Sequence, residues 1–152
     1  MAAEEAINLM TRILTIIALL FATPMLAGCA GTGISSPTLV SSQMEKDGPP
    51  RLFFYRQKQG GGAAFALDVE LNEKKIGRLG IGEVAIGKIA EGQNRLRVRH
   101  LLIGSFEHTF EGGKENRYIM TDFANGWRTV IDFIELNPEI FAHKVSQGKY
   151  RF

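Results

Sequence analysis

The stretch Ala66–Val98, which reads ALDVELNEKKIGRLGIGEVAIGKIAEGQNRLRV, decides the fold class of this chain. FALDVEL, over Phe65–Leu71, alternates apolar and polar residues, and an alternation of period two is typical of a strand with one buried face. NEKKIG then turns the chain back towards its next apolar residues, and a second turn follows at Glu91 and Gly92. The stretch therefore predicts two consecutive β-hairpins. Phe65, Leu67, Val69 and Leu71 would share one face of the first strand, the turn returns into Ile76 and Leu79, and Leu96 and Val98 would face inward.

Outside this stretch, short apolar alternations separated by turn residues continue along the chain, which is the pattern of an antiparallel sandwich or barrel. The strands that we expect lie near 51–57, 64–71, 75–79, 83–90, 93–101, 104–111, 116–123 and 128–135. The fold class predicted is all-β, a small antiparallel β-sandwich of the immunoglobulin or transthyretin-like kind.

The C-terminal segment has a different pattern, which predicts one short helix at about 138–147. Asn137 is a suitable N-cap, Pro138 suits the first turn, and Gly148 suits the end. Ile140, Phe141 and Val145 would share its apolar face. We expect this helix to close an open end or edge of the sandwich.

Length and charge limit the remaining possibilities. The chain has 152 residues, a formal net charge of +2 and one cysteine, Cys29. This length favours a single globular domain, the balanced charge does not indicate a nucleic-acid-binding protein, and a single cysteine leaves no partner for an intramolecular disulfide.

The N-terminal segment has the proportions of a signal peptide. The apolar run Ile13–Phe21 is much shorter than the roughly 20 residues needed to span a bilayer. Arg12 precedes the run as expected, whereas Glu4 and Glu5 are unusual in a leader, so we expect translation to begin at Met10. The sequence predicts a signal peptide over 1–28.

The segment Leu26–Cys29, LAGC, follows this leader and resembles the lipobox of bacterial lipoproteins. The resemblance implies cleavage between Gly28 and Cys29, a thioether-linked diacylglycerol on Cys29 and an acyl chain, such as palmitate, on the new amino group. Ala30, the next residue, implies sorting to the outer membrane, with the domain facing the periplasm. The alternative is an N-terminal apolar helix that carries a buried cysteine.

The segment after Cys29, AGTGISSPTLVSSQMEKDGPP, is rich in serine, glycine and proline. Such a composition is typical of segments that do not bury enough apolar surface to fold. It predicts a flexible tether over 29–50, spanning about 25 Å, followed by a domain over 51–152.

Three segments resemble the DUF2846 family of small bacterial lipoproteins, which is related in style to PEGA-like domains. They are RLFFYRQ (Arg51–Gln57), the two hairpins of Ala66–Val98 and GKENRYIM (Gly113–Met120). Members of the family often have Pro-Gly at the turn where this chain has Glu91 and Gly92. The resemblance implies a compact β-sandwich without a known catalytic activity.

Arg95, Arg97 and Arg99 alternate along one strand, with their side chains about 6 to 7 Å apart on one face. Such a row could bind phosphates of lipopolysaccharide, an anionic cell-wall polymer or an acidic protein partner. The alternative is a cross-strand row of ion pairs with Asp68, Glu70 or Glu83.

No sequence pattern indicates catalysis. His100, His108 and His143 have no metal-ligand spacing, and no strained Gly-x-Ser-x-Gly turn is present. The glycine-rich QGGGAA and GRLGIGE lack the flanking residues of a phosphate loop. We therefore expect a membrane-anchored, non-enzymatic binding or structural module with no metal or cofactor besides the lipid on Cys29. The alternatives are a component of a secretion or envelope assembly machine, of the type VI kind, and a cell-wall-acting enzyme.

Overall fold

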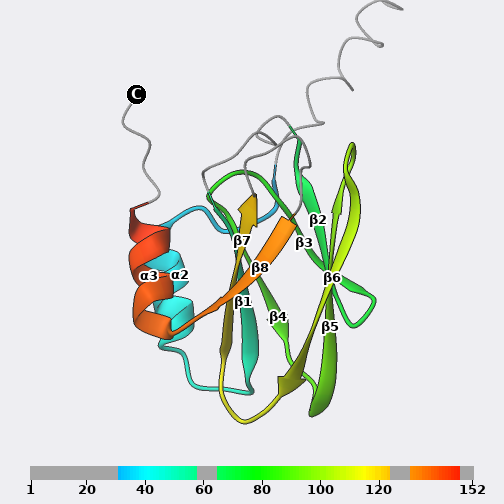
Figure 1. Ribbon diagram of the computed structural model, residues 1–152. Helices are drawn as coiled ribbons and strands as arrows, with labels where there is room; N and C mark the ends of the chain where they lie inside the picture. Colours follow the sequence, from blue (N-terminus) through cyan, green and yellow to red (C-terminus); the bar gives the residue numbers. More distant parts are fainter. Residues whose placement is uncertain (1–30, 58–64, 124–130, 148–152) are drawn as a thin grey trace, which may run out of the picture. The chain divides into compact units, whose positions relative to one another are not determined.

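The computed structural model describes residues 31–57, 65–123 and 131–147, and the chain from Gly31 onward forms one compact unit (Figure 1). Within these residues the elements, in chain order, are α2 (Pro37–Met44), β1 (Arg51–Arg56), β2 (Leu67–Leu71), β3 (Lys74–Leu79), β4 (Val84–Lys88), β5 (Gly92–His100), β6 (Gly104–Gly112), β7 (Arg117–Phe123), β8 (Ile131–Leu136) and α3 (Pro138–Ser146). None of the described helices is long and apolar enough to cross a membrane.

The strands form two four-stranded sheets, in the orders β4-β1-β7-β8 and β3-β2-β5-β6. The expected small β-sandwich with a C-terminal helix is thereby confirmed. One pair departs from antiparallel pairing, since β1 and β7 run parallel. Lettered along the chain, the sheets read DAGH and CBEF, which differ from the ABED and CFG sheets of an immunoglobulin constant-type domain.

The first of the two hairpins predicted over Ala66–Val98 forms, between β2 and β3. The second is wrong: β4 pairs with β1 in one sheet and β5 pairs with β2 and β6 in the other, so the turn at Glu91 and Gly92 connects the two sheets. Leu67, Val69 and Leu71 of β2 are buried between the sheets, together with Leu96 and Val98 of β5. The β2–β3 turn has two residues with positive φ, Asn72 at 50° and Glu73 at 67°, as a type I′ hairpin requires. Gly92, with φ of 77°, supplies the same left-handed conformation at the second turn.

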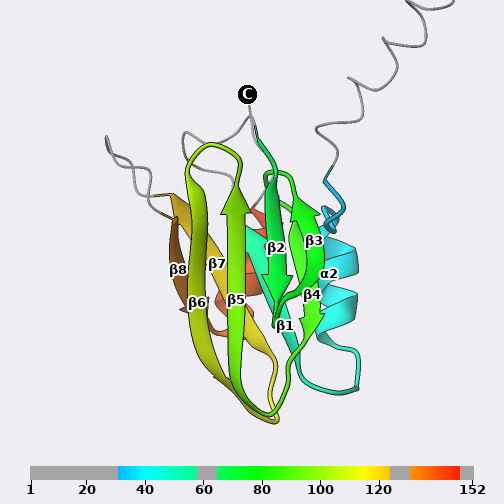
Figure 2. The same cartoon turned by 90° about the vertical axis from the view of Figure 1, so that its right-hand side faces the viewer.

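A third layer of two helices covers the outer face of the β4-β1-β7-β8 sheet (Figures 1 and 2). Strand β1 requires such cover because its apolar residues are consecutive: Leu52 and Phe54 face the sandwich core, while Phe53 and Tyr55 face the helices. Phe141 of α3 packs edge-on against these two rings, with centroids 6.3 and 6.1 Å away. The expectation that α3 closes an end or edge of the sandwich is therefore wrong.

The local signals for α3 are confirmed. The Asn137 side chain accepts a hydrogen bond from the backbone N–H of Ile140 at 2.8 Å, and Pro138 occupies the first turn. Phe141 and Val145 are buried, whereas Ile140 is exposed. The helix ends at Ser146.

The expected tether is wrong over residues 31–50. Helix α2 forms there, with Ser36 as its N-cap, and the side chain of Val40 is only 1% exposed. Before the helix, Ile34 makes a two-way backbone pair with Val84 of β4, with both N···O distances 2.9 Å. The composition of the segment is polar, but Val40 is buried in the cluster that contains Phe53, and Ile34 and Met44 pack against this cluster.

Several expectations fall on residues that the structure does not describe. These are the signal peptide, the cleavage site at Gly28 and Cys29, the first residue of the strand expected over 64–71, the first residues of the last predicted strand (128–130) and the helix stop at Gly148.

Candidate functional site

The row of Arg95, Arg97 and Arg99 lies on the outer face of β5, as the alternation predicted. Each arginine contacts a carboxylate. Arg95 contacts Glu73 at 2.6 Å, and the Nε of Arg97 contacts Glu107 at 2.6 Å. Arg99 contacts Glu70 directly, and Arg97 reaches the same carboxylate at 3.7 Å.

This arrangement corresponds to the alternative of a cross-strand row of ion pairs. Only some of its carboxylates are the ones that the sequence analysis expected. Glu70 was among the expected partners, but Asp68 pairs with Lys75 at 2.6 Å instead. Glu107 lies directly opposite Arg97 in the register with β6. Its carboxylate raises the pKa of Arg97 above the usual value, first by a hydrogen bond and then by its charge. The alternation of β6 in the sequence already placed Glu107 outward and could have identified it.

The row is therefore a mixed surface of three arginines and three carboxylates. An anionic ligand would have to displace carboxylates that already occupy the guanidinium groups. The ligand-binding role of this face stays a prediction, and the observed contacts favour the structural alternative.

Arg56 at the end of β1 is a buried arginine that the sequence analysis missed. Its side chain is 1% exposed and donates from Nη1 to the carbonyl oxygens of Phe65 at 2.7 Å and Leu79 at 2.8 Å. Burial lowers the pKa of Arg56, and the nearby charge of Glu83 partly offsets that effect. Leu52, Phe54 and Arg56 are alternate residues of β1 and therefore share one face of the strand. This alternation could have identified Arg56 as a residue that points inward. Because its polar atoms bond backbone carbonyls across the sandwich, Arg56 has a structural role.

Glu83 connects the first residues of the folded unit with the β3–β4 turn through hydrogen bonds. Its Oε2 accepts from the backbone N–H of Gly80 at 2.8 Å and of Gly33 at 3.3 Å. A Cβ at Gly31 or Gly33 would overlap the Glu83 side chain, and at Gly33 also Leu79, so these glycines permit the close approach. Glu83 is thus not a member of the arginine row.

The histidines lie on three different elements, as expected. His100 is buried at the end of β5, and its Nδ1 accepts from the backbone N–H of Leu102 at 3.2 Å. His108 on β6 stacks on Phe133 and lies 3.3 Å from Glu135, while His143 on α3 is exposed. Across the described ranges, no group of three or more metal-ligating side chains converges.

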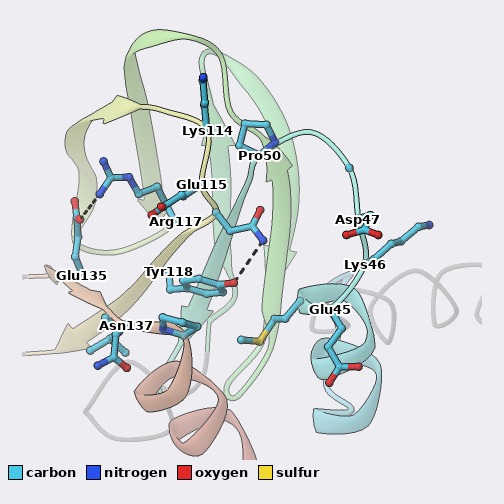
Figure 3. Close-up of a pocket in the computed structure, with 15 residues that line it drawn as sticks. Glu45, Lys46, Asp47, Pro50, Lys114, Glu115, Arg117, Tyr118, Glu135 and Asn137 are labelled. Carbon is cyan, nitrogen blue, oxygen red and sulfur yellow. Dashed lines mark hydrogen bonds and ion pairs between the residues drawn. The ribbon is translucent and has the colours of Figure 1, made fainter.

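A depression of about 520 Å³ opens at the end of the unit where β1 and β7 begin (Figure 3). Three segments far apart in the sequence form its walls: the α2–β1 link, the β6–β7 loop and the β8–α3 junction. Its charged side chains are Glu45, Lys46, Asp47, Lys114, Glu115, Arg117 and Glu135. The sequence analysis missed this site because only the tertiary structure brings the three segments together.

Hydrogen bonds and an ion pair hold several of the residues that line the depression. Asn116 accepts from the backbone N–H of Arg51 at 2.9 Å and lies 3.5 Å from the Tyr118 hydroxyl. Arg117 pairs with Glu135 at 3.5 Å. The described residues that line it include no serine, threonine, cysteine or histidine. The lining therefore combines acidic and basic side chains on one polar surface.

Comparison with known proteins gives no relative: no protein-family model, no curated protein and no solved structure matches this chain.

Proposed function

We propose that this chain is a lipid-anchored lipoprotein of the bacterial cell envelope, whose sandwich binds a partner or has a structural role and catalyses no reaction. The observation that carries the proposal is LAGC, over Leu26–Cys29, directly after the apolar run Ile13–Phe21. The folded unit begins at Gly31, so cleavage before Cys29 would remove none of the described elements.

The proposed location is the outer membrane, on its periplasmic side, because Ala30 follows the lipidated residue. Two or three acyl chains would make the anchor effectively permanent, since each buried methylene contributes about 0.8 kcal/mol. The membrane is then the first partner of the protein.

The depression beside Lys114 is the surface that we propose for a protein partner. It lies at the end of β1 where Arg51 stands, whereas Ile34 pairs with Val84 near the other end of that strand. A six-residue strand separates its ends by about 17 Å. A partner could thus reach the depression while the other end of the unit is held at the membrane.

Mass spectrometry of the mature chain tests the anchor. The wild type should begin at Cys29 and carry diacylglycerol and an N-acyl chain, while Cys29→Ala should remain uncleaved and unmodified. A wild-type chain with a free Cys29 thiol would refute the proposal.

Photo-crosslinking in the native envelope tests the partner surface. A photoreactive residue in place of Lys114 should capture a defined protein, and one in place of Lys74, which is exposed on β3, should not. Equal capture from both positions would contradict the assignment. Capture of secretion-machine components would favour the assembly alternative.

A further inference from the structure

We propose that the β5–β6 turn, with Leu101 and Leu102 at its tip, lies in the membrane interface and acts as a second, non-covalent contact with the phospholipid surface. The inference rests on the proposed lipid anchor at Cys29. It adds an orientation of the sandwich on the membrane that the anchor alone would not determine.

The first step is the length of chain between the anchor and the folded unit. Only Ala30 separates Cys29 from Gly31, and two residues of fully extended chain span at most about 7 Å. A lipid on Cys29 would therefore hold Gly31 within that reach of the lipid headgroups. The flexible tether that the composition predicted would have allowed far more freedom.

The second step is that the chain at Gly31 cannot swing away from the sandwich. Thr32 donates its backbone N–H to the carbonyl of Arg78 at 2.6 Å, and its hydroxyl accepts from the Arg78 N–H at 2.9 Å. The bonds of Glu83 to Gly33 and Gly80 add a further attachment. The end of the unit that carries the β3–β4 turn is therefore the end held at the membrane.

The third step places the β5–β6 turn at this same end. Leu67 of β2 pairs with Leu79 of β3 on one side and with His100 of β5 on the other. The β3–β4 turn begins directly after Leu79, and the β5–β6 turn directly after His100. Strands β3 and β5 are separated only by β2, so they lie about 10 Å apart. Figure 2 shows both turns and the first described residues at one end of the unit.

The fourth step is the composition of the turn. Leu101 is 78% exposed and Leu102 68%, the two highest values among the large exposed hydrophobic residues of the described chain. Ile103, by contrast, packs against the sandwich core, and the Leu102 N–H is bonded to His100. The turn is thus attached at its base and presents two leucines outward. Exposed apolar side chains on a fixed turn suit insertion among lipid acyl chains.

Basic side chains stand beside the leucines. A depression of about 510 Å³ next to the turn is lined in part by Arg78, Arg99 and Leu101. Arg99 contacts Glu70 through its guanidinium group, and 53% of its side chain stays exposed beside the turn. This combination of apolar tip and basic flank is typical of a surface that meets an anionic bilayer.

Spin-label accessibility on the full lipidated protein tests the proposal. In the mature chain the Cys29 sulfur carries the diacylglycerol as a thioether, so a cysteine introduced by Leu102→Cys is the only one that takes a nitroxide. Ile140→Cys on α3 is the matched control, because Ile140 is an exposed apolar residue on the helix that begins at the other end, beside the charged depression. Both positions are exposed, so the fold should tolerate both changes. The proteins are reconstituted in vesicles of phosphatidylethanolamine and phosphatidylglycerol.

We expect the label at position 102 to be open to oxygen and several-fold less accessible to a water-soluble nickel chelate than the label at 140. Equal access of the chelate to both positions would overturn the proposal. Protection at 102 from both reagents would also overturn it, since a second copy or another protein would then cover the turn. The mass of each purified chain separates the two hypotheses: a chain without acyl groups refutes the anchor, whereas an acylated chain with an aqueous label at 102 refutes only the docking turn.

Discussion

Replacement of Val40 by alanine tests whether α2 belongs to the folded unit. The Val40 side chain is 1% exposed and packs in the cluster that contains Phe53, Tyr55 and Phe141. Removing two buried methyl groups costs about 1.6 kcal/mol in transfer free energy, and the cavity left behind brings the loss to about 2 kcal/mol. The adjacent Leu39, which is 58% exposed, provides the control, and Leu39→Ala should cost less than about 0.5 kcal/mol.

Urea unfolding of the chain from residue 30 onward, followed by circular dichroism, measures both variants. With a slope of about 1.5 to 2 kcal/mol per molar urea, Val40→Ala should lower the midpoint by about 1 M. Leu39→Ala should leave it nearly unchanged. If the two variants unfold at the same midpoint as the wild type, α2 is not packed in solution, and the segment is the flexible tether that its composition indicates.

Three further predictions concern α3, the Glu83 attachment and the arginine row. Phe141→Ala should lower the free energy of unfolding by about 3 to 5 kcal/mol, and Ile140→Ala by less than about 1 kcal/mol, in the same urea experiment; equal losses would contradict the covered outer face. Glu83→Ala should cost about 1 to 3 kcal/mol because two backbone N–H donors lose their acceptor, while Glu83→Gln, which keeps an acceptor oxygen, should lose less. Replacing Arg95, Arg97 and Arg99 together by glutamine should leave binding to lipopolysaccharide unchanged, because carboxylates already occupy these side chains; a clear loss of binding would restore the ligand-binding hypothesis.

Local patterns in the sequence were sufficient for the strands and for α3. Alternation over Phe65–Leu71 gave the buried face of β2 because side chains of a strand alternate between its two faces. Asn137 and Pro138 gave the start of α3 because capping depends on residues next to one another. The parallel pairing of β1 with β7 had no local signal, since strands distant in the sequence pair according to the path of the whole chain.

The arginine row could be predicted in part from the sequence, whereas the charged depression could not, because local patterns do not show which distant segments meet. The outward direction of Arg95, Arg97 and Arg99 follows from local alternation, but the choice of Glu73 and Glu107 as partners depends on the register of neighbouring strands. The charged depression could not be predicted because its three walls come from separate parts of the chain.

The sequence by itself determined a β-sandwich, the tight β2–β3 hairpin, a capped C-terminal helix and a lipobox-like segment before the domain. Only the tertiary structure decided that residues 31–50 belong to the folded unit. An isolated helix of eight residues is marginal in water, so α2 depends on the aromatic outer face of β1, where Phe53 and Tyr55 need cover. Local composition describes what a segment can bury alone, whereas its final state depends on the apolar surface that the rest of the chain offers it.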